Sequence, residues 1–281
     1  MSIPLIDRLA PLGPRADAWL CDIWGVLHNG AAAFPDAVAC LAAFKAGGGT
    51  TILVSNAPRP AASVATQLAA LGIPASAYAA ILTSGDVTHT ALGAVGATPL
   101  LHIGPERDRA LFADRAFVFV PADAAELIVC TGLYDDTREG PEDYRATLTA
   151  LARRGVAMLC ANPDIRVDRG GQIVYCAGAI AGLYEQLGGR VTYAGKPHPP
   201  IYAAALAKIA ELRGAPVAAG RILAIGDGIA TDIAGAHAAG IASVYVASAI
   251  HLGGPLDAGA LDRLFGATSY RPLAAMPALV W

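Results

Sequence analysis

The chain has 281 residues, of which 55% are hydrophobic and 15% are charged. This length fits one large domain, or a core domain that carries a smaller inserted one, and the apolar content excludes a disordered chain. The formal net charge is −3 and no run of Lys or Arg is present. We therefore expect neither a nucleic-acid partner nor binding to an anionic membrane surface.

The cysteines and the first residues indicate a compartment. The five cysteines have no C-x-x-C spacing and mostly stand in apolar stretches such as ELIVC, which is typical of reduced, buried thiols. The start, MSIPLIDRLAPLG, has no basic segment followed by a long apolar run, so we expect no signal peptide. These features predict a cytoplasmic protein.

One segment has the length of a membrane span. Residues 233–256 contain no Asp, Glu, Lys or Arg, and about 20 apolar residues can cross a bilayer. The segment also contains His237, His251, several glycines and a Gly-Gly-Pro sequence. We therefore expect a helix end, a buried strand and a loop here, and no membrane partner.

Short apolar runs alternate with Ala-rich helical stretches along the chain. The predicted strands, most of them continuously apolar, are 18–24, 50–56, 126–132, 157–162, 221–227 and 242–247. The segments 36–48 and 200–214 have the length of helices and end at glycine. Apolar strands that alternate with helices are typical of parallel strands covered on both faces. The sequence predicts an α/β fold with a doubly wound parallel sheet.

Polar residues follow several predicted strands at the edge where such sheets bind ligands. Asp22 follows the apolar part of the first run (18–24), Ser55 and Asn56 end the second, and Asp227 ends the run at 221–227. Lys196 precedes the helix at 200–214. An Asp can accept a phosphoryl group, Mg²⁺ takes carboxylate oxygens, and a lysine neutralises phosphate charge. Two helix N-caps would be the structural alternative for the aspartates.

Four motifs in order resemble those of the haloacid dehalogenase (HAD) superfamily of hydrolases. They are DIWGVLHNG (22–30), LVSNAPRP (53–60), GKPHPPIY (195–202) and GDGIATDIAGAHAAG (226–240). The resemblance implies a Rossmann-like core with Asp22 as nucleophile and Lys196 as a catalytic and phosphate-binding residue. It also implies phosphate contacts from Ser55 and Asn56. Mg²⁺ would be bound by Asp22, the Trp24 carbonyl and Asp227, with Asp232 beside or on the metal.

More than a hundred residues separate the second motif from the lysine motif, which resembles the subclass with a large α/β cap inserted there. Ribonucleotide monophosphatase and pyridoxal-phosphate phosphatase typify that subclass, and TSGDVT (83–88), CTGLYDD (130–136) and CANPD (160–164) are similar to its cap sequences. The expected core is 1–83 with 190–281, and the cap is 84–189. Asn162 and Asp164 of the cap are the expected specificity residues, and His28 of the core is a further candidate. A homodimer formed through the cap is a further hypothesis.

The chain departs from the family at Trp24, where most HAD phosphatases carry a second Asp as general acid and base. An indole cannot shuttle protons near neutral pH, and His28 is the nearest substitute donor in sequence, otherwise a loop histidine. The leading hypothesis is a Mg²⁺-dependent hydrolase of a small phosphorylated metabolite, a sugar or nucleotide phosphate, acting through an aspartyl-phosphate. Cleavage of a different bond, such as P–C, and phosphate binding without turnover are the alternatives.

Overall fold

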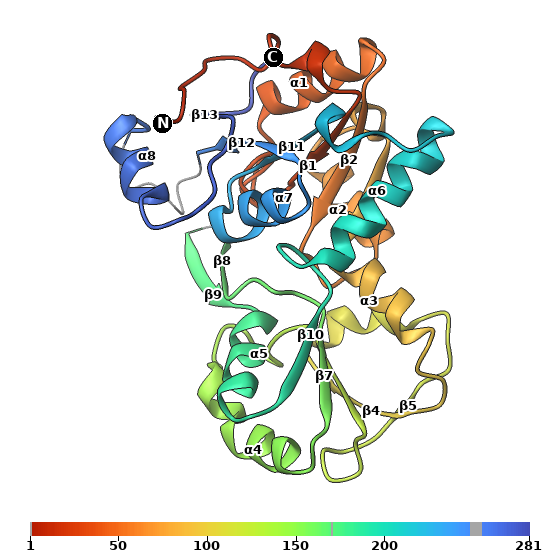
Figure 1. The fold of residues 1–281 in the computed structure, drawn as a ribbon. Coiled ribbons are helices and arrows are strands. Elements are labelled where there is room, and N and C mark those ends of the chain that lie inside the picture. The colour runs from red at the N-terminus through yellow and green to blue at the C-terminus, as the bar shows by residue number, and fades with distance from the viewer. Residues whose placement is uncertain (1, 170, 248–254) are drawn as a thin grey trace. The chain divides into compact units, whose positions relative to one another are not determined.

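The structure, a computed structural model, describes residues 2–169, 171–247 and 255–281 (Figure 1). The chain forms two compact units. The first comprises Met1–Ser55, Ala65–Leu82 and Tyr202–Trp281, and the second comprises Asn56–Val64 and Thr83–Ile201. Each unit contains its own parallel sheet, so each is described by itself.

The first unit is built on a six-stranded sheet in the order β13-β12-β11-β1-β2-β3. Its strands are β1 (Ala18–Cys21), β2 (Thr50–Ser55), β3 (Ala80–Thr83), β11 (Ile222–Gly226), β12 (Ala242–Val246) and β13 (Ala274–Met276). The pairs from β13 through to β2 are parallel. Every residue of the two central strands, β1 and β11, is buried, which explains their unbroken apolar sequences.

Helices flank this sheet (Figure 1). They are α1 (Pro35–Ala46), α2 (Ala61–Ala70), α6 (Pro199–Arg213), α7 (Ala234–Ala238) and α8 (Ala258–Phe265). Aromatic contacts join α1 and α8 to the sheet. Phe44 of α1 stacks on Trp19 of β1 with ring centroids 3.7 Å apart, and Phe265 of α8 meets Tyr245 of β12 edge-on at 5.4 Å. These contacts fix the sheet on which the candidate site is built.

The second unit has a five-stranded parallel sheet in the order β10-β7-β6-β4-β5. Its strands are β4 (Pro99–Ile103), β5 (Val118–Phe119), β6 (Leu127–Cys130), β7 (Ala157–Cys160) and β10 (Arg190–Tyr193). Its helices are α3 (Ser84–Leu92), α4 (Arg145–Arg153) and α5 (Ala177–Gln186). Strands β8 (Arg166–Arg169) and β9 (Gln172–Tyr175) form a separate antiparallel hairpin.

Short 3-10 turns complete the chain at Gly13–Arg15, Ala75–Ala77, Glu106–Phe112, Pro141–Tyr144 and Ala219–Arg221. The main hydrophobic core of the second unit lies where α4 and α5 pack on β6 and β7, and it includes Ile128, Met158, Leu148 and Tyr184. The Tyr184 hydroxyl reaches the Val156 carbonyl at 2.5 Å, so this buried ring has its polar atom satisfied.

The predicted α/β fold with parallel sheets is confirmed. All six predicted strands are present, and β6 and β7, which fall in the expected cap range 84–189, belong to the second sheet. The second unit includes residues 56–64, 83 and 190–201, which the sequence places with the core. Two local reasons are that β10 pairs with β7 and that the Asn56 side chain hydrogen-bonds the backbone of Lys196.

The apolar segment 233–256 contains the end of a short π-helix (Ile229–Ile233), helix α7 and strand β12. Residues 248–254 of this segment lie outside the described residues. Across the described ranges, the structure contains no helix with the length and apolar character that a membrane crossing requires.

Candidate active site

Asp22 is the first residue after β1, the strand that lies between β11 and β2 in the first sheet. Its backbone N–H donates to the Ile225 carbonyl of β11 at 2.8 Å, and its own carbonyl accepts from the Cys21 thiol at 3.2 Å. These contacts hold the backbone of Asp22 at the sheet edge. The residue is 9% exposed, so its carboxylate stands at the border of the protein interior.

Asp227 and Asp232 come from the segment that follows β11. Asp227 is the first residue after that strand, and a short π-helix from Ile229 to Ile233 then leads into α7. The Asp232 N–H donates to the Gly228 carbonyl at 2.8 Å, and one carboxylate oxygen of Asp232 accepts from the Gly228 N–H at 3.2 Å. The Tyr202 hydroxyl donates to the Asp232 carbonyl at 3.2 Å, which ties α6 to this turn.

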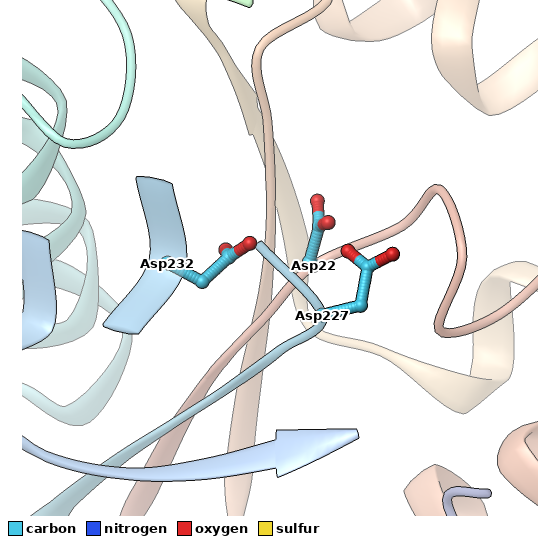
Figure 2. Close-up of side chains that lie close together, drawn as sticks. All are labelled: Asp22, Asp227 and Asp232. Carbon is cyan, nitrogen blue, oxygen red and sulfur yellow. The ribbon is translucent and has the colours of Figure 1, made fainter. Parts of the chain in front are cut away.

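The three carboxylates form one cluster. Each of Asp22, Asp227 and Asp232 is buried and offers an oxygen, and these oxygens all lie within 4.8 Å of one another. The Asp232 carboxylate is directed toward the other two side chains (Figure 2). Two unit charges about 4.8 Å apart repel by roughly 3 kcal/mol at an effective dielectric constant of about 20. A bound cation would remove this repulsion.

The donor set fits a hard divalent cation. An octahedral Mg²⁺ site with metal–oxygen distances of about 2.1 Å has opposite oxygens about 4.2 Å apart. The carboxylate oxygens of the cluster lie within 4.8 Å of one another, so only small side-chain movements separate them from that arrangement. Asp22, Asp227 and Asp232 are therefore the residues that could hold such a metal.

Two glycines keep space free for these carboxylates, and the sequence reasoning did not single them out. Gly25 has φ +80°, and a Cβ there would lie 2.2 Å from an Asp227 carboxylate oxygen. A Cβ on Gly226 would lie 2.2 Å from the carboxyl carbon of Asp232. The glycines at the third position after Asp22 and directly before Asp227 were the available signals, but their reason is spatial.

The loop after Asp22 is closed by an interaction between Trp24, His28 and Gly30. The indole and imidazole rings meet edge-on with centroids 5.0 Å apart, and a Cβ on Gly30 would lie 2.6 Å from the indole. The Gly30 N–H donates to Nδ1 of His28 at 2.9 Å. His28 is 1% exposed, and burial lowers the pKa of its ring. Its contacts are those of a structural loop histidine.

Ser55 ends β2, the strand beside β1. The parallel register pairs Cys21 with Leu53, so Ser55 lies at the same edge of the sheet as Asp22, about one residue further along. The residue is partly buried. This placement brings a hydroxyl group to the edge that carries the three carboxylates.

Asn56 and Lys196 lie together in the second unit. The Asn56 side chain accepts from the Lys196 N–H at 2.7 Å and donates to the Lys196 carbonyl at 3.1 Å. Its amide also donates to a carboxylate oxygen of Asp164 at 2.8 Å. The side chain of Asn56 thus fixes the backbone of the lysine loop. The sequence predicts a phosphate contact for Asn56 and contains no signal for these hydrogen bonds to the lysine loop.

Asp164 and Asn162 share a tight turn at the end of β7. The Asp164 N–H donates to the side-chain oxygen of Asn162 at 3.0 Å, and the Cys160 thiol donates to the Asn162 carbonyl at 3.3 Å. Burial raises the pKa of the Asp164 carboxyl, while the Asn56 hydrogen bond and the charge of Lys196 oppose that shift. The lysine and the two expected specificity residues are therefore linked within one unit.

Comparison with known proteins places the chain in a family. Residues 19–118 match the model of haloacid dehalogenase-like hydrolases, and residues 193–263 match a related HAD-hydrolase-like model. A hydrolase of the haloacid dehalogenase-like family from Brucella suis is 45% identical, with 98% of this chain and 100% of that chain covered and a TM-score of 0.87. The chain belongs to the haloacid dehalogenase-like hydrolase family.

Other solved HAD structures share the fold at lower identity. A "possible sugar phosphatase" from Cytophaga hutchinsonii is 20% identical over 99% of both chains, with a TM-score of 0.81. A glycerol phosphate phosphatase from Mycobacterium tuberculosis, solved in complex with calcium, is 26% identical, with 84% of this chain and 67% of that chain covered and a TM-score of 0.63. Comparison with the curated proteins gave no match. The HAD resemblance carried by the four motifs is confirmed.

Proposed function

We propose that this HAD hydrolase is a phosphatase that uses Mg²⁺ to hydrolyse a small phosphorylated metabolite, a sugar or nucleotide phosphate. One observation carries the proposal: three buried carboxylates from two neighbouring strand ends lie within 4.8 Å of one another. The names of similar proteins support it, since they include a sugar phosphatase, a 4-nitrophenylphosphatase from Thermotoga maritima and a glycerol phosphate phosphatase.

In the proposed reaction, a carboxylate oxygen of Asp22 attacks phosphorus as the bond to the leaving oxygen breaks, which forms an aspartyl-phosphate. Water then attacks phosphorus, the bond to Asp22 breaks, and inorganic phosphate leaves. Ser55 is proposed to hydrogen-bond the phosphoryl oxygens. Lys196 is proposed to neutralise their charge, on the resemblance of GKPHPPIY to the lysine motif. The hydrogen bonds of Asn56 suit it to hold the lysine loop.

The proposed metal ligands are Asp22, Asp227 and the Trp24 carbonyl. Asp232 is proposed either to bind the metal directly or to lie beside it. A bound Mg²⁺ would neutralise charge on the phosphoryl oxygens as they transfer. The choice of Mg²⁺ rests on an all-oxygen donor set, because Cys and His ligands would favour zinc instead. Within the described residues, these three aspartates form the only group of three or more carboxylate, thiolate or imidazole ligands that lie close enough together to hold one metal ion.

Trp24 favours a second candidate function, in which the scaffold cleaves a bond such as P–C or binds a phosphate ligand without turnover. Its indole packs against His28 and Gly30 in the loop after Asp22. A positioned acid typically contributes about 10²–10⁴-fold to the rate. Esters whose leaving groups need a proton should therefore be poor substrates.

A panel of phosphate esters and phosphonates, assayed with millimolar Mg²⁺, tests these functions. We expect aryl esters such as 4-nitrophenyl phosphate to turn over faster than alkyl esters, and Asp22→Asn to abolish both. Phosphonate cleavage without ester hydrolysis would favour P–C chemistry. Binding of inorganic phosphate without any turnover would favour the binding function. Turnover that persists after chelation of divalent cations would contradict the metal proposal.

The compartment and assembly stay proposals as well. All five cysteines are buried thiols outside any disulfide, which suits the reducing cytoplasm proposed from the sequence. Residues 84–189 are proposed to form the cap, and a homodimer through it stays a hypothesis. Size-exclusion chromatography with light scattering would test it, since a monomer at micromolar concentration would exclude a stable dimer.

A further inference from the structure

Two arginines clasp one buried carboxylate in the second unit. Both terminal nitrogens of Arg169 bond to Asp136, at 3.0 and 2.7 Å, and a terminal nitrogen of Arg107 bonds to the same carboxylate at 2.5 Å. These hydrogen bonds, of which those from Arg169 have the largest effect, hold the pKa of Asp136 below its usual range. The carboxylate is therefore anionic at neutral pH.

The two cations of this cluster face outward and its anion is hidden. The side chains of Arg107 and Arg169 are 53% and 45% exposed, whereas that of Asp136 is 8% exposed. A guanidinium carries five N–H donors in a fixed fork. Asp136 is the hydrogen-bond partner of both guanidinium groups in the described part of the chain. Several donors on each arginine thus remain for an external acceptor.

The local charge balance is positive. Arg59 and Arg107 both act electrostatically on the buried carboxyl of Asp108, as does Asp136. Within the hydrogen-bonded group itself, the two guanidinium groups of Arg107 and Arg169 stand against the one carboxylate of Asp136, so this group carries +1. An external anion would find a net attraction here.

The cluster lies at the edge of the second sheet where open α/β sheets bind ligands. Arg107 follows β4, and Asp136 follows β6, the neighbouring parallel strand. The loop with Asn162 and Asp164 follows β7, which pairs with β6. These three loops therefore leave the same edge of one sheet. A ligand at that edge would meet the arginine pair and the expected specificity residues together.

The arginine pair is also joined to the lysine loop by contacts within the second unit. Asp164 lies two residues before the hairpin that carries Arg169, and Cys176 after the hairpin donates its N–H to the Ile165 carbonyl at 2.9 Å. The side chains of Asn162, Arg169 and Asp136 all act on the pKa of the Cys176 thiol, so they lie around it. Asp164 in turn accepts from Asn56, which holds Lys196.

We propose that Arg107 and Arg169 form an anion subsite that binds a second acidic group, a carboxylate or a second phosphate, on the leaving group of the substrate. This inference rests on the proposed phosphatase function and narrows its substrate class. Planar arginine forks pair bidentately with both kinds of acid, which is why the two are treated as one chemistry. A neutral sugar or alcohol would gain nothing from these residues.

Matched substrate pairs test the subsite and separate the two acids. Glycerol 3-phosphate and 3-phosphoglycerate differ by a carboxylate, and glucose 1-phosphate and glucose 1,6-bisphosphate differ by a phosphate. We expect a lower KM for the acidic member of at least one pair, by roughly tenfold for a charge-assisted bond at a half-exposed site. The pair that shows the difference identifies the acid.

Substitution then assigns the effect to the arginines. In Arg107→Met and Arg169→Met, the KM ratio between acidic and neutral members should shift by roughly tenfold toward the neutral one. Arg169→Lys, which keeps the charge but loses the fork, should retain part of the discrimination. Arg145→Met is the matched control, because Arg145 lies in the same unit, is 48% exposed and pairs with Glu142 at 2.6 Å. It should leave the ratio unchanged.

A binding measurement separates this proposal from the proposed function. Calorimetry on Asp22→Asn with 3-phosphoglycerate, glycerol 3-phosphate and the two glucose esters needs no turnover. Preferential binding of an acidic ester, lost in the double variant with Arg169→Met, supports the subsite even if no ester is hydrolysed. Hydrolysis of all four esters with equal KM, or a KM ratio that the arginine variants leave unchanged in folded protein, would overturn the subsite and leave the phosphatase intact.

Discussion

Gly25→Ala is expected to displace Asp227 from the carboxylate cluster. Gly25 has φ +80°, and a Cβ at this position would lie 2.2 Å from one Asp227 carboxylate oxygen and 2.8 Å from the carboxyl carbon. An ordinary carbon–oxygen contact is roughly 3.3 Å. The carboxylate must therefore retreat by about 1 Å, or the loop after Asp22 must move by as much.

The expected size of the effect has two parts. The positive φ costs about 1–2 kcal/mol of stability for any residue with a Cβ. The displaced carboxylate changes function, since a misplacement of about 1 Å can cost about 10²-fold in rate. Loss of support around a metal typically costs about 10–100-fold in affinity. We therefore expect a folded protein with Mg²⁺ affinity and turnover each reduced at least about tenfold.

Gly48→Ala separates these two parts. Gly48 has φ +86° in the turn after α1, and a Cβ there would meet nothing within 4 Å. It carries the same backbone strain as Gly25→Ala without the collision. Thermal melting should show similar destabilisation in both variants, whereas Mg²⁺ titration by calorimetry and turnover of 4-nitrophenyl phosphate should separate them. Equal Mg²⁺ affinity and turnover in the two variants would refute the reasoning.

Three further predictions follow from single residues. Asp22→Asn should abolish phosphatase turnover, because an amide is a poor nucleophile, and retention of most activity in steady-state assays would contradict the covalent route. Trp24→Asp, if thermal melting shows it folded, should raise the alkyl-to-aryl ratio of turnover, by up to about 10²–10⁴-fold. Burial and the charge of Arg109 lower the pKa of His102 to about 4, so below about pH 6.5 the unfolded chain takes up a proton that the folded protein refuses. Stability should fall by roughly 3 kcal/mol between pH 6.5 and 4 in urea unfolding, and His102→Phe should remove that part of the fall.

The strands that could be predicted from sequence are those at the centres of the two sheets. Strands β1 and β11 are buried along their whole length, so their sequences are continuous apolar runs. The edge strands β10 and β5 of the second sheet carry no such run. In β10 exposed and partly buried residues alternate in RVTY, and both residues of β5 are exposed. Their pairing depends on neighbours distant in sequence, which the pattern of one segment does not contain.

The same distinction holds at the candidate site. Asp22 and Asp227 could be placed together because each follows a parallel strand, and strand ends share one edge of a sheet. The role of Asn56 depends on contacts across 140 and 108 positions of sequence, to Lys196 and Asp164. The space that Gly25 leaves for Asp227 depends on a turn and a strand brought together by folding. Such contacts are properties of the folded chain and have no local sequence signal.

The loop from Asp22 to Gly30 explains why this hydrolase should depend on its leaving group. Because the Gly30 N–H donates to Nδ1 of His28, the hydrogen of the neutral ring is on Nε2. Burial lowers the pKa of that ring, so it holds no extra proton to give near neutral pH. Trp24 packs against this imidazole and has only an unreactive indole N–H. Neither side chain can act as the acid, so this loop supplies no proton for an alkoxide leaving group. Esters with acidic alcohols or phenols are therefore the substrates that this loop should favour.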